Sequence, residues 1–486
     1  MAVIHGTGYA DHTGSYISKY AEYAEYSEKS EYSEFFENRI PQRTRHHRHR
    51  THQTMRICRY IVSLVLCILS LCTWSQDYAR LSERTIMGTA RYVGMCGAMS
   101  AIGGDPSAVV DNVAGLGLYR HFEVMLSLDY ETNKTFMAPH ASTVFSLRTD
   151  NPTEQGILYH NFMLGYHRIH CFNGSVNVLT DKVPSLGALF ALAEGDLRIP
   201  FTYDRFAAST QLKIQERGYI NEYTFDWSMN ISNRWYVGAG LRIHSYSMSS
   251  EGDYLEKFQR QNMDLIKHYN YSHTKLLLNG ADCAFAAGLI VRPASWMRFG
   301  LGIETPSFGA LSIGSSGEFA AMTDSLRWAP DAPDIVSEVS DFHMPFHLST
   351  SVAFQVSRYA LIALQYDYRT IKDVPSNHSL RAGVEVVPVA GLYLNAGYAF
   401  ESAFKRSFDA VPIDPTLDRQ DAYFMYPQRQ HYISGGVGFR GRRFLIQAAY
   451  QYHMKRSYLC AHLDADPSFI TNNTHRVVLT IGWHSY

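Results

Sequence analysis

The sequence has no excess of either charge and only one long apolar run. Lysine and arginine together number 44, against 45 aspartate and glutamate residues. The chain therefore lacks the basic surplus expected of a general nucleic-acid-binding protein. A single apolar run also excludes a membrane protein built from several helices, each of which needs about 20 apolar residues. The chain is instead rich in Tyr (33), Phe (26) and Gly (34), as in membrane β-barrels, whose strands alternate polar and apolar residues.

Motifs for catalysis and metal binding are missing as well. There is no Gly-x-Ser-x-Gly and no His-Glu-x-x-His sequence. His244 and Ser245 are neighbours, so in a strand they point to opposite faces and cannot form a catalytic pair. We therefore predict no enzyme activity, no metal site and no cofactor. The expected mature chain keeps four cysteines: Cys96, Cys171, Cys283 and Cys460. They are too far apart in sequence for a zinc site, but two of them could form one disulfide.

The one apolar run, residues 60–74, is typical of a secretory signal peptide. It follows Met55 and two arginines, so a basic stretch precedes an apolar stretch that is too short to span a membrane. Small side chains near its end predict cleavage close to Ser75 and Gln76. We therefore assign residues 55–75 to the signal peptide.

Fifty-four residues precede Met55, which is unusual because a signal peptide begins at the initiator methionine. Our hypothesis is that residues 1–54 are a disordered extension that results from a mis-assigned start. Their histidine-rich tract could bind a metal, but we favour the interpretation that the tract is never translated. A lipid anchor at Cys72 is the minor alternative to signal-peptide cleavage, because Leu71 stands where a small residue is expected.

Beyond residue 121 the hydrophobic pattern has a period of two, which indicates β-strands. In the segment 222–231, Tyr223, Phe225 and Trp227 alternate with polar residues. The predicted strands run for 10–16 residues, against about 5–6 in globular sheets, and aromatic residues stand near their ends. These features predict an all-β fold: a transmembrane antiparallel barrel over residues 121–486. Fourteen strands are expected: 122–134, 142–148, 157–170, 220–231, 234–247, 275–292, 296–310, 341–357, 359–372, 377–388, 392–402, 429–440, 443–457 and 473–486.

The connections between these strands are alternately short and long. Ser232-Asn233, Ser357-Arg358 and Gly441-Arg442 are tight turns, whereas 248–274 and 403–428 are long links. Outer-membrane barrels place short turns in the periplasm and long loops at the cell surface. An even strand count puts both ends of the barrel in the periplasm. We expect the protein in the outer membrane of a Gram-negative cell, with membrane lipid and the barrel-assembly machinery as partners.

Residues 76–120 do not alternate and are rich in Gly and Ala, so they can pack closely. Asp105-Pro106-Ser107 reads as the start of a helix. We predict a plug, or hatch, inside the lumen. Three motifs carry a resemblance to a known family: Thr89–Ala98 (TARYVGMCGA), Gly103–Ala108 (GGDPSA) and Asn112–Leu116 (NVAGL).

These motifs resemble the hatch of the FadL/TodX family of outer-membrane transporters. One residue departs from the pattern: Val113 replaces the proline of the family's Asn-Pro-Ala-Gly-Leu. The resemblance implies a 14-stranded barrel with an N-terminal hatch, and passive uptake of hydrophobic compounds such as long-chain fatty acids. Heme uptake is the alternative within transport. A barrel that serves protein secretion or surface display is the alternative outside it.

The candidate ligand residues fall in two groups. In the hatch we select Asn112, with Ala114 and Gly115 of the same motif, because the Asn112 side chain could hydrogen-bond hatch or barrel backbone; a purely structural role is the alternative. The resemblance implies that the mature N-terminus, Gln76, Asp77 and Tyr78, lies near the ligand pocket. The predicted surface loop 171–219 holds an apolar stretch that could capture a hydrophobic small molecule or pack as a short helix on the rim. The residues of this apolar patch are Leu186, Leu189, Phe190 and Leu192.

Overall fold

A computed structural model describes most of the chain beyond residue 80. The described residues are 81–132, 136–150, 155–185, 206–258, 268–322, 327–328, 336–371, 374–402, 424–460 and 468–485. They belong to one compact unit, Leu66–Tyr486. The predicted extension 1–54 and signal peptide 55–75 lie outside the described residues.

Among the residues that the structure describes, no helix is long and apolar enough to cross a membrane.

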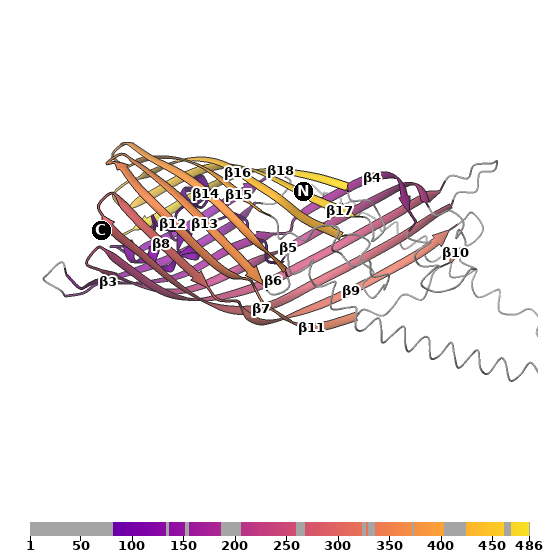
Figure 1. Ribbon diagram of the computed structural model, residues 1–486, viewed down its shortest axis with the longest axis horizontal. Helices are drawn as coiled ribbons and strands as arrows, with labels where there is room; N and C mark the ends of the chain where they lie inside the picture. Colours follow the sequence, from indigo (N-terminus) through magenta and orange to yellow (C-terminus); the bar gives the residue numbers. More distant parts are fainter. Residues whose placement is uncertain are drawn as a thin grey trace, which may run out of the picture. The chain divides into compact units, whose positions relative to one another are not determined.

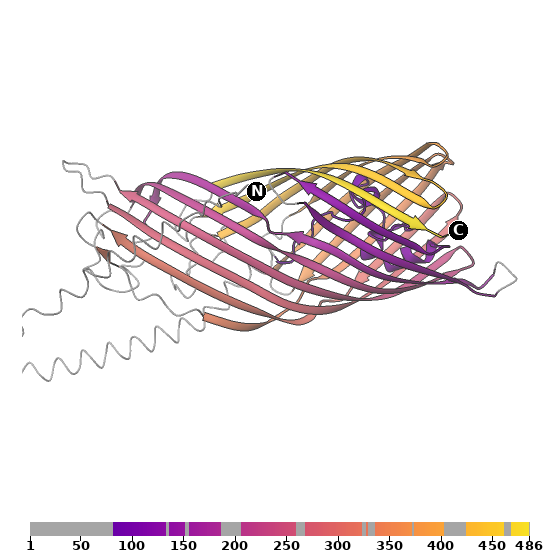
Figure 2. The same cartoon turned by 180° about the vertical axis from the view of Figure 1, so that it is seen from behind.

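Fourteen strands form a closed antiparallel barrel (Figures 1 and 2). Strand β1 (Glu123–Glu131) closes the ring, because it pairs with β2 (Met137–Arg148) on one side and with β18 (Ser468–His484) on the other. The strand number and the antiparallel order agree with the sequence prediction. The remaining strands of the ring, each hydrogen-bonded to the next, are β3 (Ile157–Cys171), β5 (Phe206–Ile231), β6 (Trp235–Phe258), β7 (His268–Ala294), β8 (Met297–Glu304), β12 (Phe346–Ser357), β13 (Ala360–Ile371), β14 (Val374–Val389), β15 (Leu392–Glu401), β16 (Phe424–Arg440) and β17 (Phe444–Cys460).

Tight turns join the strands at one end of the barrel, which we call the short-turn end. Between β5 and β6, Ser232 and Asn233 have φ values of 53° and 54°, and Asn adopts this left-handed conformation more readily than most residues. Between β14 and β15, Gly391 has φ 87°. The opposite end, at which β6 ends and β7 begins, is called the long-connection end (Figure 1).

Four further strands extend the sheet at the long-connection end. The prediction of a surface loop over 171–219 and of a long link over 248–274 is wrong, because both segments contain paired strand residues. In addition, β5, β6 and β7 are 26, 24 and 27 residues long. Their neighbours are extended as well, so backbone hydrogen bonding continues beyond the length that a membrane requires. The added strands are β4 (Gly174–Pro184), β9 (Phe308–Met322), β10 (Arg327–Trp328) and β11 (Val336–Phe342).

The predicted strand 296–310 is interrupted, and β8 and β9 lie on either side of Pro306. Proline has no N–H to donate to a neighbouring strand. Beyond the interruption, β9 continues along β7 but pairs with β11 on its other side. The break is fixed by Ser307, whose hydroxyl accepts from the Met344 amide at 2.6 Å and donates to Asp282 Oδ2 at 2.5 Å.

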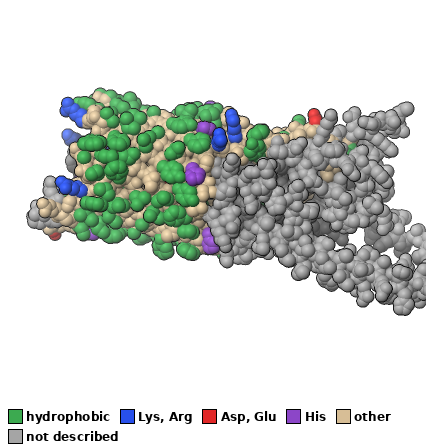
Figure 3. Space-filling view, viewed as in Figure 1, with side chains coloured by type: hydrophobic (Ala, Val, Ile, Leu, Met, Phe, Trp, Pro, Cys, Tyr) green, Lys and Arg blue, Asp and Glu red, His purple; other side chains and the backbone are tan. Residues whose placement is uncertain are grey.

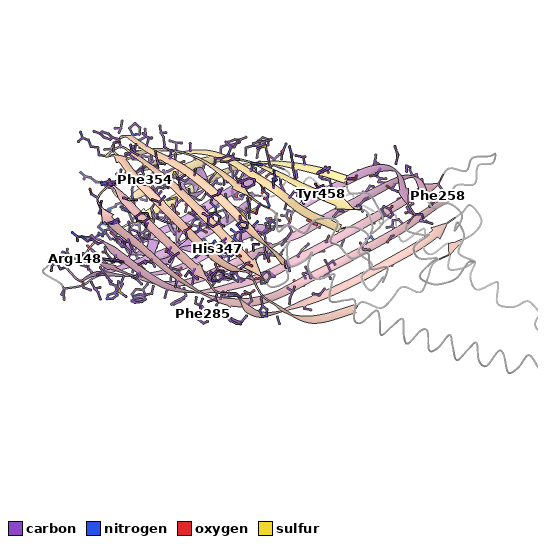
Figure 4. All side chains as sticks on the ribbon, viewed as in Figure 1. Arg148, Phe258, Phe285, His347, Phe354 and Tyr458 are labelled. Atoms are coloured by element: carbon purple, nitrogen blue, oxygen red, sulfur yellow. The ribbon has the colours of Figure 1, made fainter. Side chains whose placement is uncertain are left out.

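The wall of the barrel is apolar outside and polar inside. On β5, Tyr223 and Phe225 are 47% and 65% exposed, whereas Glu222 and Asp226 on either side of them are buried. Figure 3 shows a continuous apolar band on the outer surface, and Figure 4 marks Phe285 at the outer edge of the barrel. A soluble sheet protein has the reverse arrangement. The outer face therefore suits lipid, as expected for a transmembrane barrel.

Residues 81–120, the N-terminal segment, pack against the inner face of this wall (Figure 2). Helix α3 (Ala90–Gly94) contacts β15 to β18, and the 3-10 helix η2 (Val113–Leu118) contacts β3, β5, β6 and β7. A third helix, α4 (Ala108–Asp111), leads into η2. The segment thus reaches opposite sides of the barrel wall within about 40 residues.

Candidate functional site

The N-terminal segment is folded by a few buried polar side chains. Thr89 caps α3, since its hydroxyl accepts from the Tyr92 amide and donates to Asp105 at 2.8 Å. The same Asp105 oxygen, Oδ1, also accepts from the Ser107 amide at 3.0 Å, where α4 begins as predicted. Burial raises the pKa of the Asp105 carboxyl, and the nearby Arg91 opposes that shift. These contacts tie two distant helices of the segment into one body.

Asn112 joins the segment to the barrel wall. Its Oδ1 accepts from the Ala114 amide at 3.1 Å and so caps η2. Its Nδ2 donates to the backbone oxygens of Ser100, in the segment, and of Leu289, on β7. The residue is fully buried. Asn112 therefore satisfies backbone groups of both the segment and the wall, as the sequence suggested that it could.

Glycines on the wall allow this close approach. A Cβ on Gly288 of β7 would overlap with Oδ1 of Asn112 and stand 2.7 Å from the Ala114 nitrogen. Within the segment, the carbonyl of Gly115 accepts from the Gly104 amide at 3.1 Å. Val113, which replaces the family's proline, is buried at the start of η2 without disrupting it.

The structure thus brings Asn112, Ala114 and Gly115 together at the wall. It does not bear on the other candidates, since Gln76, Asp77, Tyr78, Leu186, Leu189, Phe190 and Leu192 lie outside the described residues.

Ion pairs also hold the segment in place. Arg91 makes a bidentate contact with Glu385 on β14, at 2.6 and 2.8 Å. Arg84 contacts Glu304 on β8 at 2.6 Å. From the other side, Arg381 on β14 donates to Asp111 at 3.1 Å. These pairs join α3, α4 and the chain before them to different parts of the wall.

Glu83 forms a further ion pair, with Lys455 on β17 at 2.6 Å. Its second oxygen accepts from Gln430 at 2.5 Å. Burial alone would raise the pKa of Glu83, but Lys455 and His170 outweigh it and hold the pKa at about 2. Glu83 is therefore ionised at any physiological pH.

The lumen beside the segment contains a connected network of charged side chains. His244 bridges two carboxylates, with Asp282 at 2.5 Å and Glu222 at 3.1 Å. Arg242 contacts Asp226 at 2.5 Å. Figure 4 marks His347, a further member, within the outline of the barrel. None of these residues was singled out from the sequence as a site residue, because lumen contacts depend on the register between strands.

Two groups in this network have the residue types of a metal site. They are Asp111, His347 and Asp367, and Glu222, His244 and Glu304, each with ligand atoms within 4.8 Å of one another. An arginine already lies against each group: Arg381 against the first and Arg84 against the second. Because a guanidinium supplies the positive charge that a metal ion would bring, the geometry favours an ion-pair network.

Cavities lie on both sides of the N-terminal segment. One, of about 110 Å³, borders Glu83 and Thr85 and the long-connection ends of β3 and β17. The other, of about 410 Å³, borders Leu118 to His121 at the short-turn end. The segment therefore separates two spaces within the same barrel.

A buried apolar cluster adjoins the first cavity, on the long-connection side of the segment. Phe172 belongs to both the cavity lining and the cluster. Leu81, the first described residue, lies in the cluster with side chains from five strands. The full cluster is Leu81, Ile169, Phe172, Ile220, Tyr246, Met248, Leu276, Leu278, Leu311 and Met344.

Comparison with known proteins gives fold-level similarity only. No protein-family model matches the chain, and no curated protein matches its sequence. A solved Pseudomonas aeruginosa FadL homologue matches with a TM-score of 0.52 and 11% identity, over 83% of this chain and 99% of that one.

Two further solved structures match less well. The Pseudomonas putida toluene transporter TodX has a TM-score of 0.47 and 12% identity, over 83% of this chain and 99% of its own. The Ralstonia pickettii toluene transporter TbuX has a TM-score of 0.45 and 12% identity, over 82% and 99%. The match to the FadL homologue shows that the chain has the same barrel fold, as its resemblance to that family implied.

Proposed function

We propose that this protein is a passive outer-membrane channel for hydrophobic small molecules, closed at rest by its N-terminal segment. The observation that carries the proposal is the position of that segment between two cavities of one closed barrel, with a buried apolar cluster on the long-connection side. The cavity on that side is lined largely by polar groups such as Glu83 and Lys455 and meets the apolar cluster at Phe172, so the cluster is the part that favours an apolar ligand. No feature of the described residues supplies an energy source, so transport follows the concentration gradient.

The outer membrane is the location that fits these features. Closed barrels satisfy every backbone hydrogen bond between strands, which is why they can reside in lipid. The apolar outer band and the predicted signal peptide support export to that membrane. We place the short-turn end in the periplasm and the long-connection end at the cell surface. The apolar cluster then faces arriving ligand.

Passage requires the N-terminal segment to move. Its contacts with the wall are charged and buried, for example Arg91 with Glu385 and Arg84 with Glu304. An apolar molecule gains nothing from such a lining, and separating the pairs inside the barrel costs several kcal/mol. We therefore propose that the cluster binds ligand first, and that a shift of the segment opens the path.

Ligand binding is tested on the intact barrel held in amphipol. Mass spectrometry and visible absorbance identify what co-purifies, and equilibrium dialysis measures binding of radiolabelled oleate. Met248→Gln places a polar group of similar size in the apolar cluster and should weaken oleate binding about tenfold. Met125→Gln is the matched control, since Met125 is equally buried but stands near the short-turn end of β1.

Several outcomes would overturn the proposal. A heme absorbance band would favour heme uptake, and a co-purifying protein with no small molecule would favour a secretion or display scaffold. Gating is tested by deletion of residues 76–115, which should make liposomes that contain the barrel leak a solute that the intact protein retains. Equal leakage by both forms would contradict a closed resting state.

A further inference from the structure

The outer surface carries the same side-chain pair three times. A tyrosine hydroxyl and a histidine Nδ1 are hydrogen-bonded across three successive strand pairs, β13–β14, β15–β16 and β17–β18. Each copy occupies two neighbouring strands, and the next copy occupies the following two. The three copies therefore cover six consecutive strands. The pairs are Tyr366–His378 at 2.8 Å, Tyr398–His431 at 2.9 Å and Tyr450–His475 at 2.6 Å.

Each histidine also has a second aromatic neighbour. The residue directly opposite it in the strand register is Tyr or Phe, with ring centroids 4.9–5.4 Å apart. Figure 3 shows histidines at the margin of the apolar band, toward the long-connection end. His378, His431 and His475 lie in the first halves of β14, β16 and β18, which begin at the long-connection end. The polar edges of the pairs are therefore at the end of the apolar band, where lipid tails give way to headgroups. The opposite residues are Tyr368 for His378, Phe400 for His431 and Tyr452 for His475.

Two exposed arginines lie just beyond these pairs. Arg429 belongs to a β-bulge on β16, between Pro427 and Gln430. The partners of these two residues on β17 are Ser457 and Lys455, so Arg456 is the residue opposite the bulge. Arg429 and Arg456 are both exposed. The register thus places two exposed arginines at the same level of neighbouring strands, on the face that carries the tyrosine–histidine pairs.

No acidic side chain balances them on this face. The described residues of β13 to β18 include three acids, Asp367, Glu385 and Glu401, and all three are buried on the lumen side. Within the described part of the chain, neither arginine has an ion-pair partner. The outer face of these six strands therefore carries positive charge alone.

We propose that this face binds the anionic phosphate headgroups of membrane lipids. We call the surface the phosphate rim: Tyr366, Tyr398, Tyr450, His378, His431, His475, Arg429 and Arg456. A guanidinium binds phosphate through paired N–H donors. A tyrosine that donates to Nδ1 leaves the imidazole proton on Nε2, where it can donate to a headgroup. The acyl chains of the same lipid then pack on the apolar band below.

An ordinary aromatic girdle does not explain the exposed arginines or the absence of acidic side chains among the described residues of this face. Tyr and Trp are enriched at both lipid interfaces of barrels whatever the charge of the lipid. The paired arginines and the absence of acids on the described strands distinguish the rim from a girdle, because they favour an anionic headgroup over a zwitterionic one. The test follows from that difference.

Native mass spectrometry of the whole barrel measures retained lipid directly. The barrel in detergent is titrated with phosphatidylglycerol or phosphatidylcholine of identical acyl chains. The wild type should retain phosphatidylglycerol at least fivefold better. Arg429→Gln with Arg456→Gln, and separately His378→Gln with His431→Gln and His475→Gln, should lower that preference to near one.

His160→Gln is the matched control, because this histidine stacks on Trp227 toward the short-turn end, with ring centroids 6.0 Å apart. It should keep the full preference. Heat-dependent migration in SDS gels verifies that every variant is folded. Equal retention of both lipids by the wild type would overturn the proposal, and so would a full preference in the folded arginine variant. The readout does not involve transport, so it can fail while the channel function stands.

Discussion

The side chain of Asn112 rests directly on the Cα of Gly288, a residue of the barrel wall 176 positions later in the chain. Asn112 donates to the next carbonyl on that strand, Leu289 O, at 3.3 Å. A side chain at position 288 would occupy the space of the Asn112 amide. The contact between the N-terminal segment and the wall therefore requires glycine, which has no Cβ, at position 288.

Gly288→Ala should loosen the segment without unfolding the barrel. Overpacking in a closely packed site costs about 1–3 kcal/mol, and the segment can relieve it by moving away from β7. Hydrogen exchange of residues 81–120 should become faster, while exchange of the strands stays unchanged. Gly435→Ala is the control, because its Cβ would meet nothing closer than 3.5 Å. Equal exchange in the two variants would contradict the steric argument.

Arg91→Met should release α3 from β14. The substitution leaves the buried Glu385 without its cation, which costs on the order of 3–5 kcal/mol. We expect larger ion conductance through the barrel in planar bilayers. Arg91→Met combined with Glu385→Leu removes both charges and should restore the low conductance of the wild type. A double variant that leaks as much as Arg91→Met would show that the pair itself does not hold the segment.

The pairing of Glu83 with Lys455 gives a pH dependence of definite sign. Its folded pKa of about 2 lies below the ordinary value of 4.5. The ionised form therefore stabilises the segment above pH 4.5, and this contribution is lost as the pH falls toward 2.

Lys455→Met should flatten that slope. Without the ammonium group the pKa of Glu83 rises, although His170 and His453 still lower it, so the segment loses less stability than the wild type as the pH falls. Hydrogen exchange of the segment at pH 6 and pH 3 measures both slopes. Parallel slopes for wild type and variant would rule out Glu83 as the group that titrates.

The mature protein should begin near Gln76. The signal peptide predicted at 55–75 is removed on export, and residues 1–54 precede the predicted start. Intact mass spectrometry of the purified barrel tests this assignment. Peptides from residues 20–50 in the same sample would show that translation begins upstream of Met55.

The barrel wall was largely predictable, because its pattern is local. Alternation in a segment such as 222–231 identifies a strand, and fourteen such segments give the ring. The added strands were missed because the pattern changes phase above the membrane. In β5, apolar side chains occupy odd positions such as Tyr223 within the band, and even positions such as Leu212 and Ile214 beyond it. Where a strand extends from lipid into water, its apolar side chains change from the outer face to the inner face.

The lumen contacts were much less predictable. Asn112 stood out as a hydrogen-bonding residue in a small-residue motif, and the structure places its amide between the segment and the wall. Its carbonyl partner on β7 could not be read from the sequence, and neither could the bridge from His244 to Asp282 and Glu222. These contacts join strands whose relative register is fixed only when the whole ring forms.

The closed ring has a consequence for assembly. The N-terminal segment is synthesised first, yet two of its anchors, Lys455 and Arg476, belong to the last two strands. The seam between β1 and β18 can form only after both strands exist. A chain that stops before residue 440 would lack the seam and both anchors at once. Complete anchoring of the N-terminal segment therefore requires the same two strands that close the barrel.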